Sequence, residues 1–201
     1  MRVLIGCEFS GRVRNAFAAL GHDAWSCDLE PSESGGNHIQ EDILKHLSDG
    51  WDLAVMHPPC THLCVSGARW WPAKVADGRQ QEGIDFFMAL VNANIPRIAV
   101  ENPIGLMSNK YRKPDQIIQP WQFGDEAQKS TCLWLKNLPL LVPTNIVGTG
   151  EIVTFKNGVR QPKWYFETLK LSPIERTKAR NRTFPGIADA MAQQWGGSCQ
   201  Q

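Results

Sequence analysis

Hydrophobic and polar positions in the first hundred residues alternate between short apolar runs and segments with helical spacing. The apolar runs predict strands at residues 2–7, 23–27, 52–56 and 97–100, and the helical spacing predicts helices over 11–20 and 79–93. After about residue 104 the pattern loosens, and it predicts short strands near 131–135 and 151–155 and a closing helix over 187–195. This alternation indicates an α/β fold, with a mostly parallel sheet and helices on both faces.

Polar or reactive residues follow several of the predicted strands. They are the segment 8–11, Asp28, Cys60 and Glu101. In open α/β sheets the ligand lies beyond the carboxyl ends of the strands. We therefore expect these clusters to share one functional edge of the sheet.

The length of 201 residues suits one domain, and 42% hydrophobic with 20% charged residues excludes a disordered or fibrous chain. The net charge of +1 is unevenly distributed, because residues 151–182 carry +5, which leaves −4 for the rest. No apolar stretch is long enough to span a membrane, and Glu8 interrupts the first apolar run too early for a signal peptide. We expect a cytoplasmic protein whose six cysteines are reduced thiols.

Two segments near these strand ends partly resemble known ligand-binding motifs but do not match them. The segment from Gly6 to Gly11 has the glycine spacing of a phosphate loop but continues with arginine and valine, so the lysine and the hydroxyl are missing. The group His57, Cys60, His62 and Cys64 matches no common zinc spacing, and we expect no metal. A strand-to-helix turn remains, either as a plain structural turn or as a place where a ligand approaches the backbone closely.

The segment Pro58-Pro59-Cys60 follows a buried strand directly. Two prolines stiffen the backbone and fix the direction of the next side chain, and a thiol held there is a nucleophile if its pKa is lowered. A buried structural cysteine is the alternative. A second cluster, Glu101-Asn102-Pro103, follows another strand and favours the chemical role. A thiol beside a carboxylic acid suits attack on an electron-poor ring, because the acid protonates or hydrogen-bonds a ring nitrogen.

These clusters resemble, in the same order, the motifs of the DNA cytosine-C5 methyltransferase family. Pro58-Pro59-Cys60 resembles the nucleophile loop, and Glu101-Asn102 resembles the Glu-Asn-Val motif with proline in place of valine. The further matches are Phe9-Ser10-Gly11, Asp28, Glu41-Asp42-Ile43, Asp77-Gly78-Arg79 and the segment 180–185. The resemblance extends over nearly the whole chain and predicts a short member of the family, similar to reduced forms from phages and prophages, in a bacterial or phage-infected cell.

The resemblance implies a Rossmann-like S-adenosylmethionine-dependent methyltransferase fold with a small C-terminal lobe. It also implies transfer of a methyl group to C5 of cytosine, after the Cys60 thiolate has attacked C6 of a base flipped out of duplex DNA. The implied catalytic residues are Cys60, Glu101 and Asn102. The implied cofactor-binding residues are Phe9, Ser10, Gly11, Asp28, Leu29, Asp42, Ile43, Pro58 and Asn181. The implied substrate-binding residues are Arg79, Gln128, Lys129, Lys163 and Trp164.

The chain departs from the family in two places. The family's Gln-x-Arg-x-Arg motif is represented by residues 128–132, where both arginines are absent, and Lys129 or a neighbouring arginine is the expected substitute. Within the single domain of residues 1–201, residues 136–180 form a reduced target-recognition region. This region contains Lys163 and Trp164, whose charge and ring suit phosphate contacts and base stacking, or form an ordinary solvated surface over a small aromatic core.

Other functions remain open on the sequence alone. The same chemistry on a free cytosine nucleotide or another nucleic acid suits the reduced region and the low net charge. A non-catalytic DNA-binding decoy suits the lost arginines but not the retained Cys60 and Glu101. An amino-methyltransferase is disfavoured because its loop carries an aromatic residue where Cys60 stands. The sequence leaves the target site and the oligomeric state open, a dimer among the options.

Overall fold

The computed structural model of the protein describes residues 1–155 and 157–197. Seven strands form one sheet in the order β3-β2-β1-β4-β5-β7-β6, and two strands form a small separate sheet. The five strands β1 to β5 pair in parallel, whereas β7 runs antiparallel to both β5 and β6. The bounds are Arg2–Gly6 (β1), Asp23–Asp28 (β2), His38–Gln40 (β3), Leu53–Met56 (β4), Arg97–Pro103 (β5), Gln116–Ile118 (β6), Thr131–Lys136 (β7), Ile152–Thr154 (β8) and Arg160–Pro162 (β9). The predicted α/β fold with a mostly parallel sheet is confirmed.

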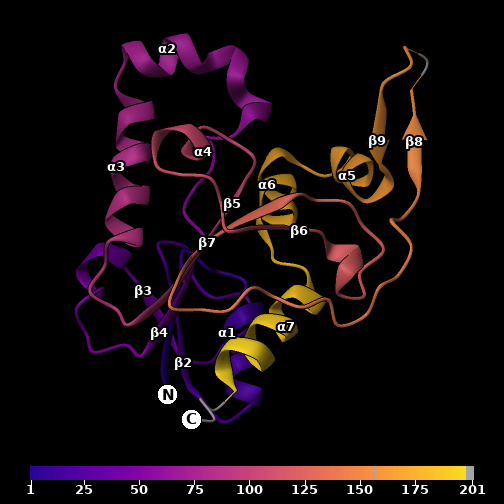
Figure 1. Ribbon diagram of the computed structural model, residues 1–201. Helices are drawn as coiled ribbons and strands as arrows, with labels where there is room; N and C mark the ends of the chain where they lie inside the picture. The colour runs from indigo at the N-terminus through magenta and orange to yellow at the C-terminus, as the bar shows by residue number, and fades with distance from the viewer. Residues whose placement is uncertain (156, 198–201) are drawn as a thin grey trace.

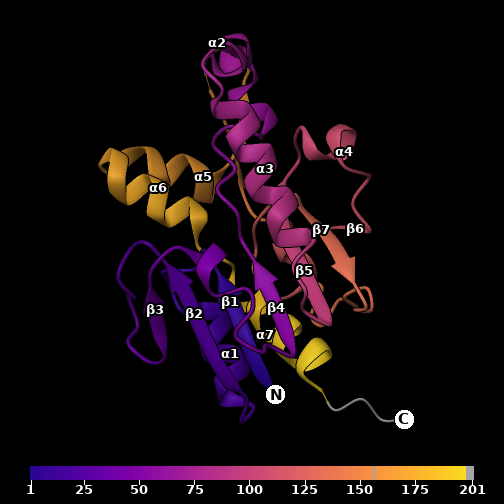
Figure 2. The same cartoon turned by 90° about the vertical axis from the view of Figure 1, so that its left-hand side faces the viewer.

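Helices cover both faces of the large sheet (Figures 1 and 2). On one face α1 packs beside α7 over Val3 and Ile5 of β1, and on the other face α3 packs over Leu4. Because side chains alternate along a strand, both sides of β1 are apolar and buried. The helix bounds are Arg12–Ala19 (α1), Trp71–Ala76 (α2), Arg79–Val91 (α3), Met107–Lys110 (α4), Lys163–Glu167 (α5), Pro173–Asn181 (α6) and Pro185–Gly196 (α7). Short 3-10 turns span Ile43–Lys45 (η1), Val65–Trp70 (η2), Pro120–Gln122 (η3) and Thr168–Lys170 (η4).

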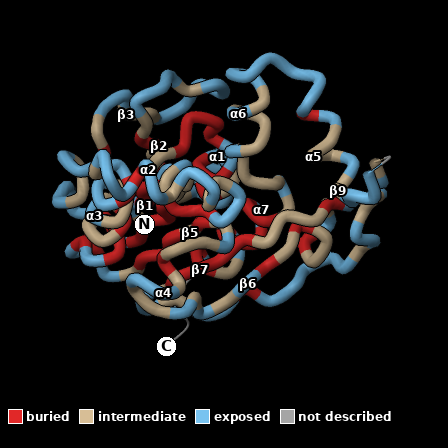
Figure 3. The backbone as a smooth tube through the Cα atoms, turned by 90° about the horizontal axis from the view of Figure 1, so that it is seen from above, coloured by how far each residue is buried: buried red, intermediate tan, exposed pale blue. Residues whose placement is uncertain are grey.

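Residues 136–180 contain the β8–β9 hairpin, α5, η4 and most of α6, and this part stands to one side of the sheet (Figure 1). Figure 3 shows its backbone mostly intermediate or exposed, in contrast to the buried strands at the centre. Its aromatic residues pack against each other, since Phe155 lies edge-on to Phe166 and Trp164 lies edge-on to Phe184. Lys156, one of the eight cations of residues 151–182, lies outside the described residues, as does Cys199.

The strand β5 is longer than the sequence pattern predicts. The expected strand ends at Val100, but β5 continues to Pro103 because β7 pairs with it antiparallel, Glu101 opposite Leu133 and Asn102 opposite Cys132. Glu101 and Asn102 therefore lie on a paired strand and not on a loose turn. The strand fixes their backbone on one side of the candidate site.

The turn between β1 and α1 is built around a buried carboxylate. Glu8 is 5% exposed, and its side chain accepts hydrogen bonds from the backbone N–H of Val13 at 2.7 Å and of Arg14 at 3.2 Å, and from the Ser10 hydroxyl at 3.2 Å. Gly11 has φ of +70° and has no capping side chain of its own. Glu8 thus satisfies the free N–H groups of the first helical turn, where a negative charge also favours the helix dipole.

Within the described residues, no helix has both the length and the hydropathy that a membrane crossing requires.

We expect Glu8→Ala to lower the free energy of unfolding by about 1–3 kcal/mol, because two backbone N–H groups and one hydroxyl lose their acceptor in a buried place. Chemical denaturation monitored by circular dichroism measures this loss. Glu126→Ala is the matched control, because Glu126 is exposed, and it should leave stability within about 0.5 kcal/mol of the wild type. Equal stability of the two variants would contradict the capping role.

Candidate active site

The order of the strands marks where a ligand site is expected. From β1 the chain builds the sheet in one direction through β2 and β3, and with β4 and β5 it builds in the other direction. A crevice opens at such a reversal, beyond the carboxyl ends of the two central strands. The carboxyl end of β1 leads into residues 7–11, and that of β4 leads into residues 57–60. The predicted clusters lie at this edge, which faces the region of α2, α5 and α6 in Figure 2.

The Cys60 loop is held rigidly against β5. The Asn102 side chain is 2% exposed and donates a hydrogen bond to the Pro58 carbonyl at 2.8 Å. On the other side of the thiol, the backbone N–H groups of Leu63 and Cys64 both donate to the Cys60 carbonyl at 2.9 Å, which closes a tight turn. Cys60 is therefore fixed at both flanks, while its side chain stays partly accessible.

Cys60 and Cys64 form an interacting pair of thiols. The hydrogen bond between them lowers the pKa of Cys64 to about 5 and raises the pKa of Cys60. The Cys64 sulfur also lies 3.1 Å from the Ser66 hydroxyl, and the cation of Lys74 further favours its thiolate. Of the two thiols, Cys64 is therefore the more acidic, and Cys60 donates to it. Sequence reasoning assigned no role to Cys64.

Glu101 is a largely buried carboxylate beside a histidine. Its Oε2 lies 3.1 Å from Nδ1 of His57, and the two side chains are 16% and 9% exposed. Burial acts to raise the pKa of Glu101, but the His57 hydrogen bond and the charges of Lys129 and His57 outweigh burial and lower the pKa. Glu101 is thus ionised in the free protein. His57 directly follows β4. From the sequence it was considered only as part of a zinc group and was assigned no other role.

Lys129 extends the positive surroundings of this carboxylate. Its Nζ donates to the Arg180 carbonyl at 2.9 Å. Its charge helps to lower the pKa of Glu101 and partly opposes the rise in the pKa of Cys60. The lysine therefore connects the active-site edge with α6. Gln128, its neighbour, is held through its backbone, because its carbonyl accepts the indole N–H of Trp164 at 3.1 Å.

The residues expected to hold a cofactor lie at the ends of β1 and β2. Asp28 uses one carboxylate oxygen for the backbone N–H of Glu30 at 2.9 Å, and burial raises its pKa. Leu29 beside it is 73% exposed, which leaves an apolar side chain free for a ligand. Cys7, in the turn after β1, has φ of +57°, a strained conformation of the kind found at functional sites.

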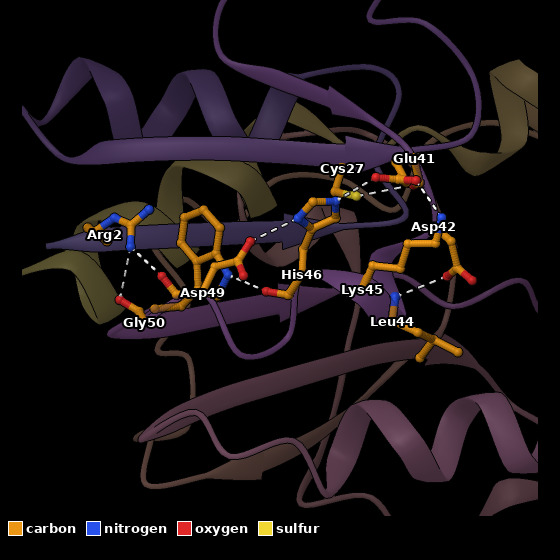
Figure 4. Close-up of polar contacts among 10 residues, drawn as sticks. Arg2, Cys27, Glu41, Asp42, Leu44, Lys45, His46, Asp49 and Gly50 are labelled. Atoms are coloured by element: carbon orange, nitrogen blue, oxygen red, sulfur yellow. Dashed lines mark hydrogen bonds and ion pairs between the residues drawn. The ribbon is translucent and has the colours of Figure 1, made fainter.

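Asp42 lies at the start of η1, after β3. Its carboxylate accepts the backbone N–H of Leu44 at 3.0 Å, and Figure 4 shows it beside the Glu41, Lys45 and His46 cluster. Asp28 and Asp42 both raise the pKa of the Cys7 thiol, after burial as the main cause, so both carboxylates lie near the same turn. The neighbouring Ile43 is 3% exposed and packs in the core.

The loop from Phe9 to Gly11 is close to α6. Lys178 of α6 lies 5.4 Å from the Phe9 ring centre, and Ser10 accepts the N–H of Arg12 on its hydroxyl at 3.3 Å. A side chain at Gly11 would collide with Arg14 and Ser34, so the glycine is required by packing within the chain. Asn181, the last residue of α6, is exposed.

Two of the residues expected to bind substrate have partners within the chain. Arg79 pairs with Asp77 in the turn between α2 and α3, and Lys163 pairs with Glu151 at 2.7 Å. Trp164 is held edge-on between Tyr165 and Phe184 at ring-centre distances of 5.7 and 5.3 Å. In the described residues no hydrogen bond or ion pair joins Arg79, Lys163 or Trp164 directly to Cys60 or Glu101.

No protein-family model matches this chain, and no curated protein matches it either. The function must therefore be inferred from the side chains at the carboxyl edge of the sheet. A thiol pair, a carboxylate with its histidine, and a lysine meet there at the ends of β4, β5 and the segment before β7. This set offers a thiol nucleophile and a carboxylate able to hold the edge of a ring.

We expect the thiolate absorbance of the wild-type protein to show one step near a pH of about 5, because Cys60 donates a hydrogen bond to the Cys64 thiolate. Cys64→Ser should remove this step. Cys60→Ala should move it to higher pH, because the donor that gives the largest lowering of the Cys64 pKa is lost. An unchanged step in Cys64→Ser would show that another thiol titrates there.

Proposed function

We propose that the protein is a Rossmann-like S-adenosylmethionine-dependent methyltransferase that transfers a methyl group to C5 of cytosine in DNA through a covalent Cys60 adduct. The observation that carries the proposal is the joining of Cys60 and Glu101 on neighbouring strand ends by the Asn102–Pro58 hydrogen bond of 2.8 Å. A cytosine ring between them would meet a thiol at C6 and a carboxylate at its N3/N4 edge. The order of motifs along the chain supports the same family resemblance.

The cofactor fits the ends of β1 and β2. The Asp28 carboxylate, with one oxygen used by Glu30 N–H, is an acceptor for ribose hydroxyls, and exposed Leu29 offers an apolar contact to adenine. Phe9 and Asp42 complete the proposed contacts, with an aromatic ring and a second carboxylate for the adenine amine. Held by these residues, S-adenosylmethionine would supply an electrophilic methyl group.

We assign each residue at the strand ends a separate role in the reaction. The Cys60 thiol loses its proton to solvent water as the sulfur electron pair forms a bond to C6, and the positive charge of Lys129 favours the thiolate. Glu101 hydrogen-bonds the N3/N4 edge and favours addition. C5 becomes nucleophilic and takes the methyl group. Solvent water takes the C5 proton, which restores the C5=C6 double bond and expels the Cys60 thiolate.

The substrate itself has two candidates. DNA suits the cations of residues 151–182 and the family resemblance. A free cytosine nucleotide is favoured by a specific observation: Lys163 is paired with Glu151, and the Trp164 indole N–H is used by the Gln128 carbonyl. The proposed stacking of a base on Trp164 would have to compete with the contacts that hold the ring edge-on.

We expect S-adenosylmethionine or its demethylated product to bind, and Asp28→Ala to weaken binding about tenfold to a hundredfold. The reason is that hydrogen bonds to a charged group are worth about 1.5–3 kcal/mol each. Isothermal titration calorimetry measures the affinity. Asp189→Ala is the matched control, because Asp189 is an exposed carboxylate on α7, and its affinity should equal that of the wild type. Absence of heat with both ligands would refute the cofactor assignment.

We expect Cys60→Ser to abolish methyl transfer while leaving the fold and cofactor binding intact, because a hydroxyl at this position is a far weaker nucleophile than a thiolate. Labelled S-adenosylmethionine is to be incubated in parallel with duplex DNA, single-stranded DNA and free dCMP. The wild type should label DNA, and 5-fluorocytosine should trap it at Cys60, since C5 then has no proton to lose. Labelling of dCMP alone would replace the DNA proposal, and an adduct at Cys64 would move the nucleophile.

A further inference from the structure

His57 of the candidate site carries a buried polar atom that has no partner among the described residues. Its side chain is 9% exposed, and its Nδ1 lies 3.1 Å from Glu101 Oε2. Its Nε2 is fully buried and has no hydrogen-bond partner in the part of the chain that the structure describes. Buried polar atoms normally find a partner, so an unpartnered nitrogen at a reactive edge calls for a functional reason.

The ring is held in place by the backbone. The His57 N–H donates to the Gly6 carbonyl at 2.9 Å, which continues the pairing of β4 with β1, and buried Pro58 follows directly. Glu101 is thus the single hydrogen-bond partner of the ring among the described residues. Because nothing holds Nε2, the protonation state of the imidazole is coupled to Glu101 and to no other side chain.

The carboxylate in turn faces a limited set of titratable groups. They come from the Cys60 loop, from the segment before β7 and from β7 itself, and they are His57, Cys60, Lys129 and Cys132. One N–H of the Lys129 ammonium donates to the Arg180 carbonyl at 2.9 Å. Among these groups His57 alone makes a recorded hydrogen bond to Glu101, and an imidazole can carry a proton on either ring nitrogen.

We propose that His57 and Glu101 form a dyad sharing one proton, in which His57 orients the carboxylate and supplies the proton that Glu101 passes to N3 of the bound cytosine. The inference rests on the proposed function, because it assigns a positioning residue to that same reaction. It also resolves a chemical difficulty, since an ionised carboxylate alone has no proton to give.

Each proton and electron pair in the step can be followed from donor to acceptor. The Cys60 sulfur forms a bond to C6, the C5=C6 electron pair moves into the C4–C5 bond, and the C4=N3 pair forms a bond to the Glu101 proton. This is the one proton that the dyad shares: it passes from His57 Nδ1 to Glu101 and from Glu101 to N3, which leaves His57 neutral and Glu101 ionised. In the exchange reaction C5 then takes a proton from water. When water removes the original C5 proton and the C6–S bond breaks, the N3 proton returns to Glu101 and from there to His57.

The test is the exchange of tritium from C5 of cytosine into water, which needs addition at C6 but no methyl donor. Rates are to be measured against pH for the wild type, His57→Gln and the control His22→Gln, whose position just before β2 is at the opposite end of the sheet. Glutamine keeps a hydrogen-bond donor for Glu101 but cannot titrate. Circular dichroism and calorimetry with S-adenosylmethionine check that each variant is folded.

We expect a bell-shaped profile for the wild type and for His22→Gln. His57→Gln should be about a hundredfold slower at neutral pH, which is the usual scale of general acid catalysis. Its alkaline fall should begin at lower pH, because the proton is then held by a carboxyl group alone.

Three outcomes would count against the dyad. A His57→Gln rate lowered by one factor at every pH, with an unchanged profile, would reduce His57 to a structural role. A wild-type rate that rises steadily with pH, as thiolate formation alone demands, would also overturn the dyad and does not depend on any variant folding. If the wild type exchanges no substrate, neither DNA nor dCMP, the proposed function itself fails and the dyad fails with it.

Discussion

The candidate site depends on one buried hydrogen bond, from the Asn102 side chain to the Pro58 carbonyl. Pro58 and Pro59 have no backbone N–H, so this part of the loop cannot anchor itself with donors of its own. A side chain from the neighbouring strand supplies the missing donor, and β5 is long enough to do so because β7 pairs with it as far as Pro103. Loss of the amide would leave a buried carbonyl without a partner, at a cost of about 1–3 kcal/mol.

Two glutamates near this edge differ in their hydrogen-bond partners. The difference separates a structural role from the proposed chemical one. The carboxylate of Glu8 is enclosed by backbone N–H groups of α1, which neither titrate nor leave, so it serves as a fixed cap. Glu101 instead faces the side chains of a histidine and a lysine. The residue type is the same near both strand ends, and the two carboxylates differ in the groups that neighbouring segments place beside them. The catalytic role proposed for Glu101 therefore rests on its tertiary partners rather than on its position at a strand end.

Hydrophobic periodicity predicted the sheet, the helices α1, α3 and α7, and the gathering of Cys60 and Glu101 at one edge, because these depend on local patterns and on the rule for parallel sheets. It did not predict β3, β6 or the extension of β5, which are set by pairing between distant residues. His57 and Cys64 were missed for the same reason. Their importance lies in contacts with Glu101 and Cys60 that no spacing along the chain encodes.

The cations of residues 151–182 bear on the choice of substrate, because a phosphate would have to replace the carboxylates that they already pair with. Lys163, Lys178 and Arg182 pair with glutamates at partly exposed positions. Exposed ion pairs contribute about 0–1 kcal/mol, so a phosphate could replace each carboxylate at little cost. The Trp164 ring is different, because its indole hydrogen bond and edge-on packing must be broken before a base can stack on it. If these residues bind DNA, we therefore expect phosphate contacts that carry no sequence information, and the proposed recognition of cytosine falls to the edge that holds Cys60 and Glu101.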